Sequence, residues 1–205
     1  EIIGDNPNDL KDLSYGNNII FKEEYSLNHG TLMAGIIAHN FKNVKIMPLI
    51  VSPKGDEHDK DIALAIRYAV NNGAKIINMS SGKKFSLYKK WIIESLKYAY
   101  KKDVLFITSA GNDNSNIDFK SYSTYPNDDI DGNGEIINNF IMIGNSTSDI
   151  ENLKEYSSNY SKKNVDLFAP GTEIYTTSKN DTYESITGSS ASSAIVSNVA
   201  ALIRS

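Results

Sequence analysis

The sequence predicts an α/β domain built around a mostly parallel β-sheet. Apolar strand-like segments alternate with amphipathic helical segments along most of the chain, which is typical of strands joined by crossover helices. Polar turns, such as residues 52–55 and 71–73, separate these segments. A chain of 205 residues with 40% hydrophobic content can bury one substantial core, so we expect a single domain over residues 1–205.

The individual elements follow from local patterns. Small residues after His29 predict a closely packed helix, and the apolar run at 45–51 predicts a buried strand. Residues 61–70 predict an amphipathic helix, because four apolar residues share one face and Asn-Asn-Gly follows as a stop. The remaining predicted elements are a strand at 74–80, a helix at 87–101, strands at 104–108, 140–144 and 165–168, and an apolar helix at 194–203.

Composition excludes several classes of partner. The net charge is −4 and the charges of both signs are interspersed, so the sequence has no cluster of basic residues that would bind nucleic acid or an anionic membrane. No apolar run reaches transmembrane length. The absence of cysteine excludes disulfides and thiolate metal sites.

Ser190 has the setting of a nucleophile. The Gly-Ser-rich stretch 188–193 leads into an apolar helical run, so we expect the Ser190 hydroxyl to cap a helix N-terminus. Exposed backbone N–H groups and the positive end of the helix dipole favour an oxyanion that forms at such a place.

Two further segments supply the other groups that a serine nucleophile needs. His29 stands at the head of a small-residue helix in Asn-His-Gly-Thr-Leu-Met-Ala-Gly (28–35), where it can accept the hydroxyl proton. Asn112 follows the predicted strand at 104–108 and offers a side-chain amide as an oxyanion donor. Taken alone, Asn112 would be read as a turn residue and His29 as a packed or surface histidine.

In combination these blocks resemble the subtilisin-like serine peptidases. That family orders its motifs as Asp, then His in H-G-T-x-x-A-G, then Asn in A-G-N, then Ser in G-T-S-x-A, and three of the four blocks occur here in that order. The resemblance continues through residues 75–80 and 165–171 and so covers nearly the whole chain. It implies a three-layer α/β/α fold and a serine endopeptidase that acts on protein or peptide substrates.

The resemblance also implies a place for the substrate. Two short segments look like the backbone edges that flank the residue preceding the cleaved bond. An extended peptide that pairs with such edges gains main-chain hydrogen bonds irrespective of its sequence. These edges are formed by Ser80, Ser81 and Gly82 and by Ser109, Ala110 and Gly111.

One component of the family's site has no counterpart in this sequence, the carboxylate that orients the histidine. In the family this aspartate ends an early strand in D-[ST]-G, and no such tripeptide occurs in the chain. Asp5 is a poor substitute, because only two apolar residues precede it after Glu1 and no Ser/Thr-Gly follows. Since the chain starts without methionine and stops within a helical pattern at 203–205, we expect an excised piece that lacks the first strand, its aspartate and the C-terminal end.

Departures from the family motifs keep a second function open. Leu32 replaces a histidine that is not a triad member, while Ala191 and Ala194 replace the Met and Pro that usually follow the nucleophile. None of these changes removes a reacting group, but they favour a slow or degenerate enzyme. The alternative is therefore a pseudo-peptidase that binds peptides or a partner without cutting. An esterase or lipase is disfavoured, because G-x-S-x-G is missing and the serine follows the histidine.

Cofactors and location complete the expectations. Residues 129–134 match the first half of a calcium loop, but Phe140 stands where the bidentate glutamate should be, and such clusters are also ordinary loop composition. We therefore expect no required cofactor and no metal ligands among the site residues, with structural calcium as an open alternative. The family resemblance implies a location outside the cell or in the cell envelope.

Overall fold

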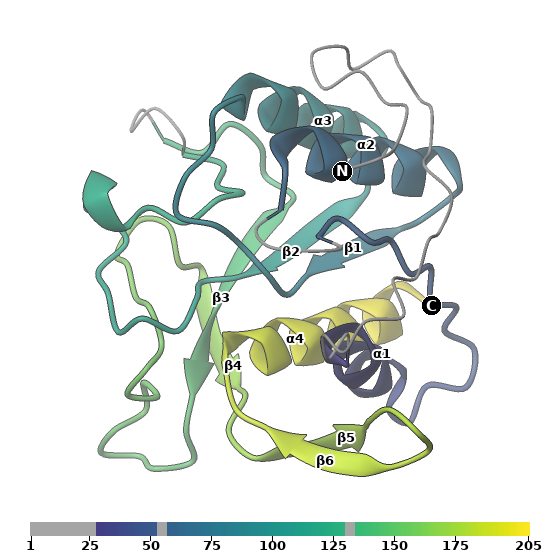
Figure 1. The fold of residues 1–205 in the computed structure, drawn as a ribbon, viewed down its shortest axis with the longest axis vertical. Coiled ribbons are helices and arrows are strands. Elements are labelled where there is room, and N and C mark those ends of the chain that lie inside the picture. The colour runs from purple at the N-terminus through teal and green to yellow at the C-terminus, as the bar shows by residue number, and fades with distance from the viewer. Residues whose placement is uncertain (1–27, 53–56, 130–133) are drawn as a thin grey trace.

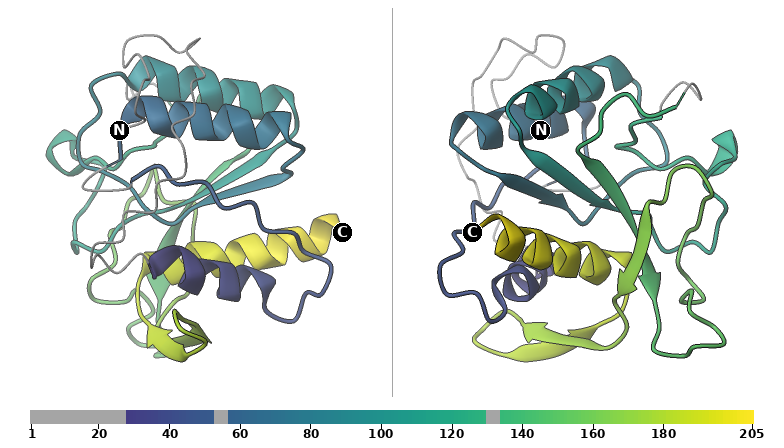
Figure 2. Two further views of the ribbon diagram at one scale, coloured as in Figure 1. Left: turned by 45° about the vertical axis from the view of Figure 1, so that its right-hand side comes forward. Right: turned by 180° about the vertical axis from the view of Figure 1, so that it is seen from behind.

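The computed structural model describes residues 28–52, 57–129 and 134–205. A parallel sheet forms the middle of three layers, with two helices on each face (Figures 1 and 2). This arrangement confirms the predicted α/β fold class and its three-layer form. Asp5, the poor substitute for the family's aspartate, lies outside the described residues.

Within the described residues, the sheet has four parallel strands in the order β1-β2-β3-β4. Their registers place the carboxyl ends of β1 and β2 side by side, since Met79 pairs with Thr108. Side chains on β2 alternate between the two faces: Phe106 packs in the cluster under α2 and α3, while Ile107 packs in the cluster under α4. The strand bounds are β1 Ile76–Met79, β2 Leu105–Ser109, β3 Phe140–Ser146 and β4 Leu167–Pro170.

The helices cover the sheet in pairs. One face is covered by α2 and α3, whose Ile62, Ile92 and Leu96 are almost fully buried against the sheet. The other face is covered by α4, and α1 packs beside it (Figure 2). The helix bounds are α1 His29–Ala38, α2 Asp59–Asn71, α3 Lys89–Lys101 and α4 Ser189–Arg204, with a short 3-10 turn at Lys120–Tyr122.

An antiparallel hairpin of β5 (Ile174–Thr177) and β6 (Tyr183–Ile186) lies below α1 and was not predicted from the sequence. Its turn is tight, with Asn180 and Asp181 both at positive φ. Asparagine and aspartate tolerate this conformation better than other residues that carry a side chain. The hairpin leads directly into α4.

Most predicted elements are confirmed within a few residues of their expected bounds, but the strand predicted at 45–51 was wrong. The segment pairs with no strand of the described residues, and Ile46 and Ile50 are exposed. Pro48 in its centre removes a backbone donor, and a strand without a paired neighbour has no ladder to hold it. Apolar composition alone therefore did not make this segment a strand. In the described part of the chain, no helix has both the length and the apolar character to cross a membrane.

Candidate active site

The N-terminus of α4 places Ser190 at the centre of the site. Gly188 is the N-cap residue and Ser189 is the first helical residue, so the prediction that the Ser190 hydroxyl caps the helix was wrong. Ser190 lies one position further into the first turn. Its backbone N–H makes no hydrogen bond among the described residues, as expected for the first N–H groups of a helix.

Asn112 is anchored beside this helix terminus. Its Oδ1 accepts a hydrogen bond from the Ser189 N–H at 2.9 Å. Its Nδ2 has no partner in the parts of the chain described and is left to donate. The site therefore holds two unused N–H donors near one another, one from the Asn112 side chain and one from the Ser190 backbone. Such a pair is the arrangement that stabilises a developing oxyanion.

Gly188 makes this close approach possible. A Cβ atom at this position would lie 3.1 Å from Asn112 Nδ2, and the backbone φ of 154° is one that side-chain-bearing residues rarely adopt. Both the conformation and the space therefore require glycine.

The Ser190 hydroxyl donates a hydrogen bond to the backbone carbonyl oxygen of Ser80 at 2.8 Å. This bond belongs to a buried polar network that ties the end of β1 to α4. The Ser80 hydroxyl donates to the Ser190 carbonyl oxygen at 2.9 Å and lies 2.8 Å from the Ser193 hydroxyl oxygen. The network fixes the backbone around Ser190, which as a residue is half-buried.

His29 is the first residue of α1 and is exposed. Within the described residues its ring makes no hydrogen bond. Desolvation by the surrounding protein lowers its pKa below 6.5, and the negative charge of Glu57 acts in the opposite direction. A lowered pKa keeps the imidazole neutral, and therefore able to take a proton, at neutral pH.

The helix that carries His29 packs closely on the hairpin because of Gly35. A Cβ atom at Gly35 would lie 2.1 Å from Thr177 Oγ1 and 2.5 Å from Thr176 Oγ1. The small residues of the His29 motif therefore let α1 approach β5, as their pattern predicts.

The two segments predicted to bind substrate lie together at one edge of the sheet. Ser80–Gly82 follows β1, and Ser109–Gly111 forms the end of β2 and the two residues after it. Just beyond the two segments, Lys84 and Asp113 form an exposed ion pair that links them, with Nζ and Oδ1 2.8 Å apart. The structure brings Ser80, Ser81, Gly82, Ser109, Ala110 and Gly111 together; their role in binding a substrate stays a prediction.

The acidic partner of His29 remains unassigned. The described carboxylate that acts electrostatically on His29 is that of Glu57, a buried residue just before α2 that sequence reasoning missed. It stands in no family motif, so the sequence held no signal for it. Sequence reasoning also missed the contact of Ser189 with Asn112.

The predicted calcium loop is only partly covered, since residues 130–133 lie outside the described residues. Within the described ranges, no group of three or more histidine or acidic side chains could hold a metal ion. Burial, together with the negative charges of Glu135, Asp166 and Asp129, raises the pKa of Asp128 to about 7. Structural calcium stays an untested expectation.

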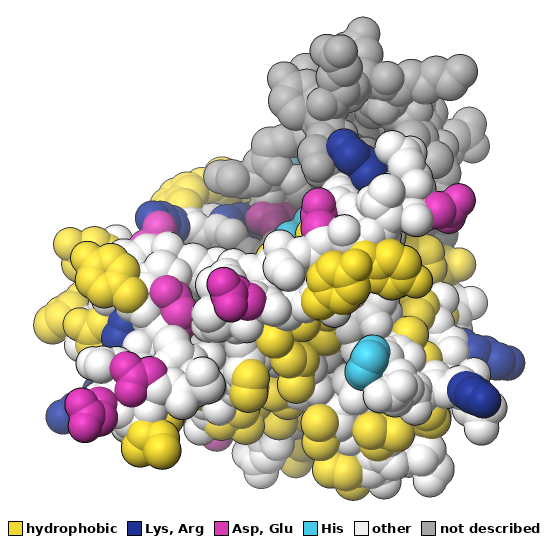
Figure 3. Space-filling view, turned by 90° about the horizontal axis from the view of Figure 1, so that it is seen from below, with side chains coloured by type: hydrophobic (Ala, Val, Ile, Leu, Met, Phe, Trp, Pro, Cys, Tyr) yellow, Lys and Arg dark blue, Asp and Glu magenta, His cyan; other side chains and the backbone are white. Residues whose placement is uncertain are grey.

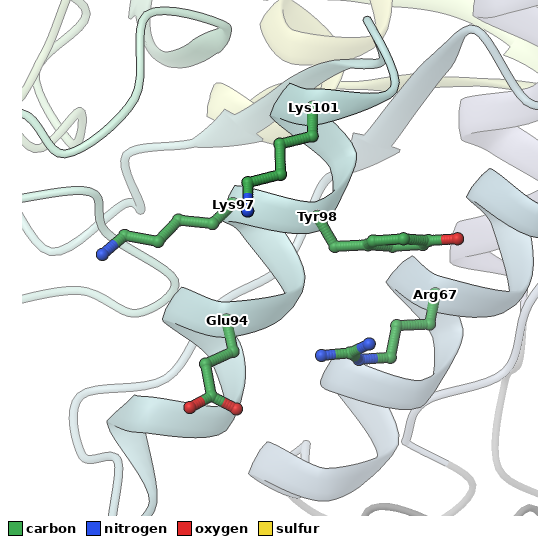
Figure 4. Close-up of a pocket in the computed structure, with 5 residues that line it drawn as sticks. All are labelled: Arg67, Glu94, Lys97, Tyr98 and Lys101. Carbon is green, nitrogen blue, oxygen red and sulfur yellow. The ribbon is translucent and has the colours of Figure 1, made fainter.

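A hollow of about 270 Å³ between α2 and α3 is separate from this site (Figure 4). It lies on the opposite side of the sheet from α1 and α4. The Arg67 guanidinium lies over the Tyr98 ring there, 5.3 Å from its centroid. The lining residues are Arg67, Glu94, Lys97, Tyr98 and Lys101.

Comparison with known proteins agrees with this geometry. The "Subtilase family" (Peptidase_S8) model matches residues 5–205. The "Major intracellular serine protease" of Bacillus subtilis is 34% identical over 188 residues, which are 86% of this chain and 55% of that protein. The "Cell wall-associated protease" of the same organism is 29% identical over 186 residues, which are 85% of this chain and 19% of that protein.

Solved structures show the same fold. A crystal structure of "a cold adapted subtilisin-like serine proteinase" superposes with a TM-score of 0.69 at 27% identity, over 86% of this chain and 60% of that one. This chain spans about half the length of the Bacillus subtilis "Major intracellular serine protease". The matched family model, the order of the motifs and the geometry around Ser190 agree, and the chain belongs to the subtilase family.

Proposed function

We propose that this chain carries the catalytic residues of a serine endopeptidase. The observation that carries the proposal is the pair of unengaged donors at the start of α4, the Ser190 N–H and Asn112 Nδ2, next to the hydroxyl of the half-buried Ser190. Donors that are fixed before the reaction stabilise negative charge on a carbonyl oxygen more effectively than water does.

In the proposed reaction, Ser190 Oγ attacks the carbonyl carbon of the scissile peptide bond and His29 accepts the hydroxyl proton. The negative oxygen of the tetrahedral intermediate is held by Asn112 Nδ2 and the Ser190 N–H. His29 then gives the proton to the leaving amine, which leaves an acyl-enzyme that water hydrolyses by the same steps. We propose that the carboxylate that orients His29 comes from a segment outside the described residues.

The substrate is proposed to be an extended peptide. The residues that follow β1 and β2, of which Gly82 is exposed and Ser81 and Gly111 are half-buried, offer backbone groups on both sides of a bound chain. The Ser80 carbonyl oxygen, which accepts the Ser190 hydroxyl, would accept a peptide N–H instead when a substrate is bound.

One observation favours the second candidate, a peptide-binding scaffold without catalysis. The Ser190 hydroxyl donates to Ser80 and not to His29, and His29 makes no hydrogen bond to a carboxylate in the described residues. A serine in this state is not yet activated.

The test is labelling of the intact protein with a fluorophosphonate probe, which reacts only with an activated serine. Ser190→Ala removes the proposed nucleophile, and Ser185→Ala, an exposed serine on β6, is the matched control. Labelling that survives in Ser185→Ala and disappears in Ser190→Ala supports the peptidase. A folded protein that is not labelled at all would reject the peptidase and support the scaffold.

Location outside the cell or in the cell envelope stays part of the proposal. The names of the relatives include both an intracellular and a cell wall-associated protease. Fractionation of the native source, followed by immunodetection, decides between these compartments.

A further inference from the structure

Asn28, the residue before His29, makes an unusual set of contacts. It occupies the N-cap position of α1, where an asparagine side chain normally accepts a hydrogen bond from the helix backbone, but it makes no such bond. Its side chain instead reaches the β5–β6 hairpin, about 150 residues away in the sequence. Giving up a favourable local contact for a distant one suggests that the distant contact has a role.

The nitrogen and the oxygen of the Asn28 amide both make hydrogen bonds in this contact. Nδ2 donates to Ser178 Oγ at 2.7 Å and to Glu184 Oε1 at 2.6 Å, and Oδ1 accepts from the Lys179 N–H at 2.8 Å. The residue is only 6% exposed. Two donors and one acceptor are therefore held in a buried setting, where an unmatched partner would be costly.

The hairpin that receives Asn28 is connected to Ser190 at its other end. Its strand β6 ends at Ile186, and the Gly188 N–H then donates to the Gly171 carbonyl oxygen at 2.8 Å, just before α4 begins. Apolar packing joins the same three elements, since Leu32 of α1, Ala191 of α4 and Ile186 of β6 lie in one cluster. The hairpin therefore contacts both helices that carry the reacting groups.

The outer face of the hairpin is turned to solvent. Tyr175 and Tyr183 stack there with ring centroids 5.6 Å apart and remain 70% and 59% exposed. Figure 3 views the molecule from this lower side and shows hydrophobic side chains at the surface. Among the described residues, the contacts that hold the hairpin in place therefore come from its inner side.

Other bonds hold α1 further along its length. Thr177 Oγ1 donates to the Thr31 carbonyl oxygen and Thr176 Oγ1 to the Leu32 carbonyl oxygen, each at 3.0 Å. The contacts of Asn28 are the ones at the very end of the helix, adjacent to His29. Thr31 and Leu32 still tie the end of the first turn to the hairpin, so loss of the Asn28 contacts would free the N-terminal end of α1, where His29 lies, to move relative to Ser190.

We propose that Asn28 is a positioning residue for His29: its amide clamps the first turn of α1 to the hairpin and so sets the imidazole relative to Ser190. This inference rests on the proposed peptidase function only for its catalytic consequence. The clamp also includes Glu184, whose carboxylate accepts the second Nδ2 proton. Proton transfer depends steeply on placement, and a displacement of about 1 Å can lower a rate by about 100-fold.

The experiment uses the intact protein and three variants. Asn28→Ala removes the clamp and is expected to slow fluorophosphonate labelling of Ser190, and kcat on a peptide, by about 10- to 100-fold with little change in KM. Asn28→Asp places a carboxylate against Glu184 and is expected to be at least as slow. In the double variant Asn28→Asp/Glu184→Gln, the new amide at position 184 can donate to the new carboxylate at position 28. This variant is expected to recover most of the rate.

Thr176→Val is the matched control, because it removes a hydrogen bond between the same helix and the same hairpin at Leu32, three residues after His29, and leaves the Asn28 contacts intact. It is expected to lower the melting temperature, though by less than Asn28→Ala, which removes three hydrogen bonds, and to leave labelling near that of the wild-type protein. Equal slowing in both variants, or wild-type labelling in Asn28→Ala, overturns the inference.

A second readout keeps the inference separate from the proposed function. The His29 ring is followed by NMR through its C2 proton as pH is varied. Release of the clamp is expected to let the ring move out of its partly desolvated setting, so Asn28→Ala should raise the pKa of His29 toward its ordinary value, and Thr176→Val should not. An unlabelled wild-type protein rejects the peptidase alone, whereas an unchanged His29 titration in Asn28→Ala rejects the clamp.

Discussion

The hydroxyl of Ser190 donates to the backbone carbonyl oxygen of Ser80 at 2.8 Å, and the Ser80 hydroxyl donates back to the Ser190 carbonyl oxygen at 2.9 Å. This reciprocal pair ties the start of α4 to the end of β1, across 110 residues of sequence. The network that keeps the serine in place is thus built from small polar side chains as well as from the helix itself.

Ser80→Ala is expected to destabilise the protein by about 1–3 kcal/mol. The Asn78 amide donates to Ser80 Oγ at 2.8 Å, and the substitution leaves that donor without its acceptor. Ser81→Ala, a neighbour whose side chain makes no hydrogen bond among the described residues, serves as the control. Urea unfolding of both variants measures the difference; equal midpoints would show that the network does not contribute to stability.

Asn112→Ala is expected to lower kcat by about 10²–10³-fold with KM almost unchanged. The lost group is a donor to the oxyanion, which is fully charged only in the transition state and the tetrahedral intermediate. Because Asn112 Oδ1 also accepts from the Ser189 N–H, a stability measurement must accompany the kinetics. Steady-state hydrolysis of a peptide substrate is the assay, and a loss confined to KM would contradict the assignment.

Gly188→Ala is expected to reduce both stability and labelling of Ser190. The added methyl group would lie 3.1 Å from Asn112 Nδ2 at a strained φ of 154°. Gly30→Ala is the matched control, since nothing lies within 4 Å of a Cβ atom there and the position is helical. The control should be neutral or slightly stabilising, because alanine favours a helix by about 0.5–1 kcal/mol over glycine. Thermal melts and labelling rates report both effects.

The pH dependence of labelling should follow His29. The base acts only when neutral, and desolvation lowers its pKa, so the rate should stay high down to a pH below 6.5 and fall as the ring is protonated. Glu57→Gln removes the charge that raises the pKa, so the acid limb should move to still lower pH. Glu151→Gln, at an exposed position, should leave it unchanged. A limb that shifts upward in Glu57→Gln would reject this account.

Lys83→Met is expected to destabilise the protein by about 3–5 kcal/mol, because it leaves a buried carboxylate without its counter-charge. Lys83 Nζ lies 2.6 Å from Asp59 Oδ1, and the two side chains are 8% and 4% exposed. The double variant Lys83→Met/Asp59→Leu should be far less destabilised, which denaturant unfolding can measure.

The same ion pair predicts how stability changes with acid. Desolvation raises the pKa of Asp59, but hydrogen bonds from Lys83, the Tyr88 N–H and Ser86 outweigh it, and the net pKa is lowered. The stabilisation is present above the ordinary pKa of aspartate and is lost as pH falls through the lowered value. Acid unfolding of the wild-type protein should therefore be steeper than that of the double variant.

Elements that depend on local sequence signals were predicted correctly, whereas elements that depend on a distant partner were not. The helix at 61–70 and the strand at 104–108 were predicted, because periodicity and turn residues are local signals. The prediction of a strand at 45–51 was wrong and the β5–β6 hairpin was missed, because a strand forms only when a neighbouring strand pairs with it. The same holds for the cap of α4, where Gly188 and not Ser190 occupies the N-cap position.

By itself the sequence determined the fold class and the order of His29, Asn112 and Ser190, since each lies in a short motif whose residue types and spacing dictate local geometry. Only the tertiary structure decided that Ser190 donates to Ser80, that Asn28 reaches the hairpin, and that Lys83 neutralises Asp59 in the interior. These pairs join residues from 24 to more than 100 positions apart. Their meeting depends on how the layers pack, which no local pattern of residues encodes.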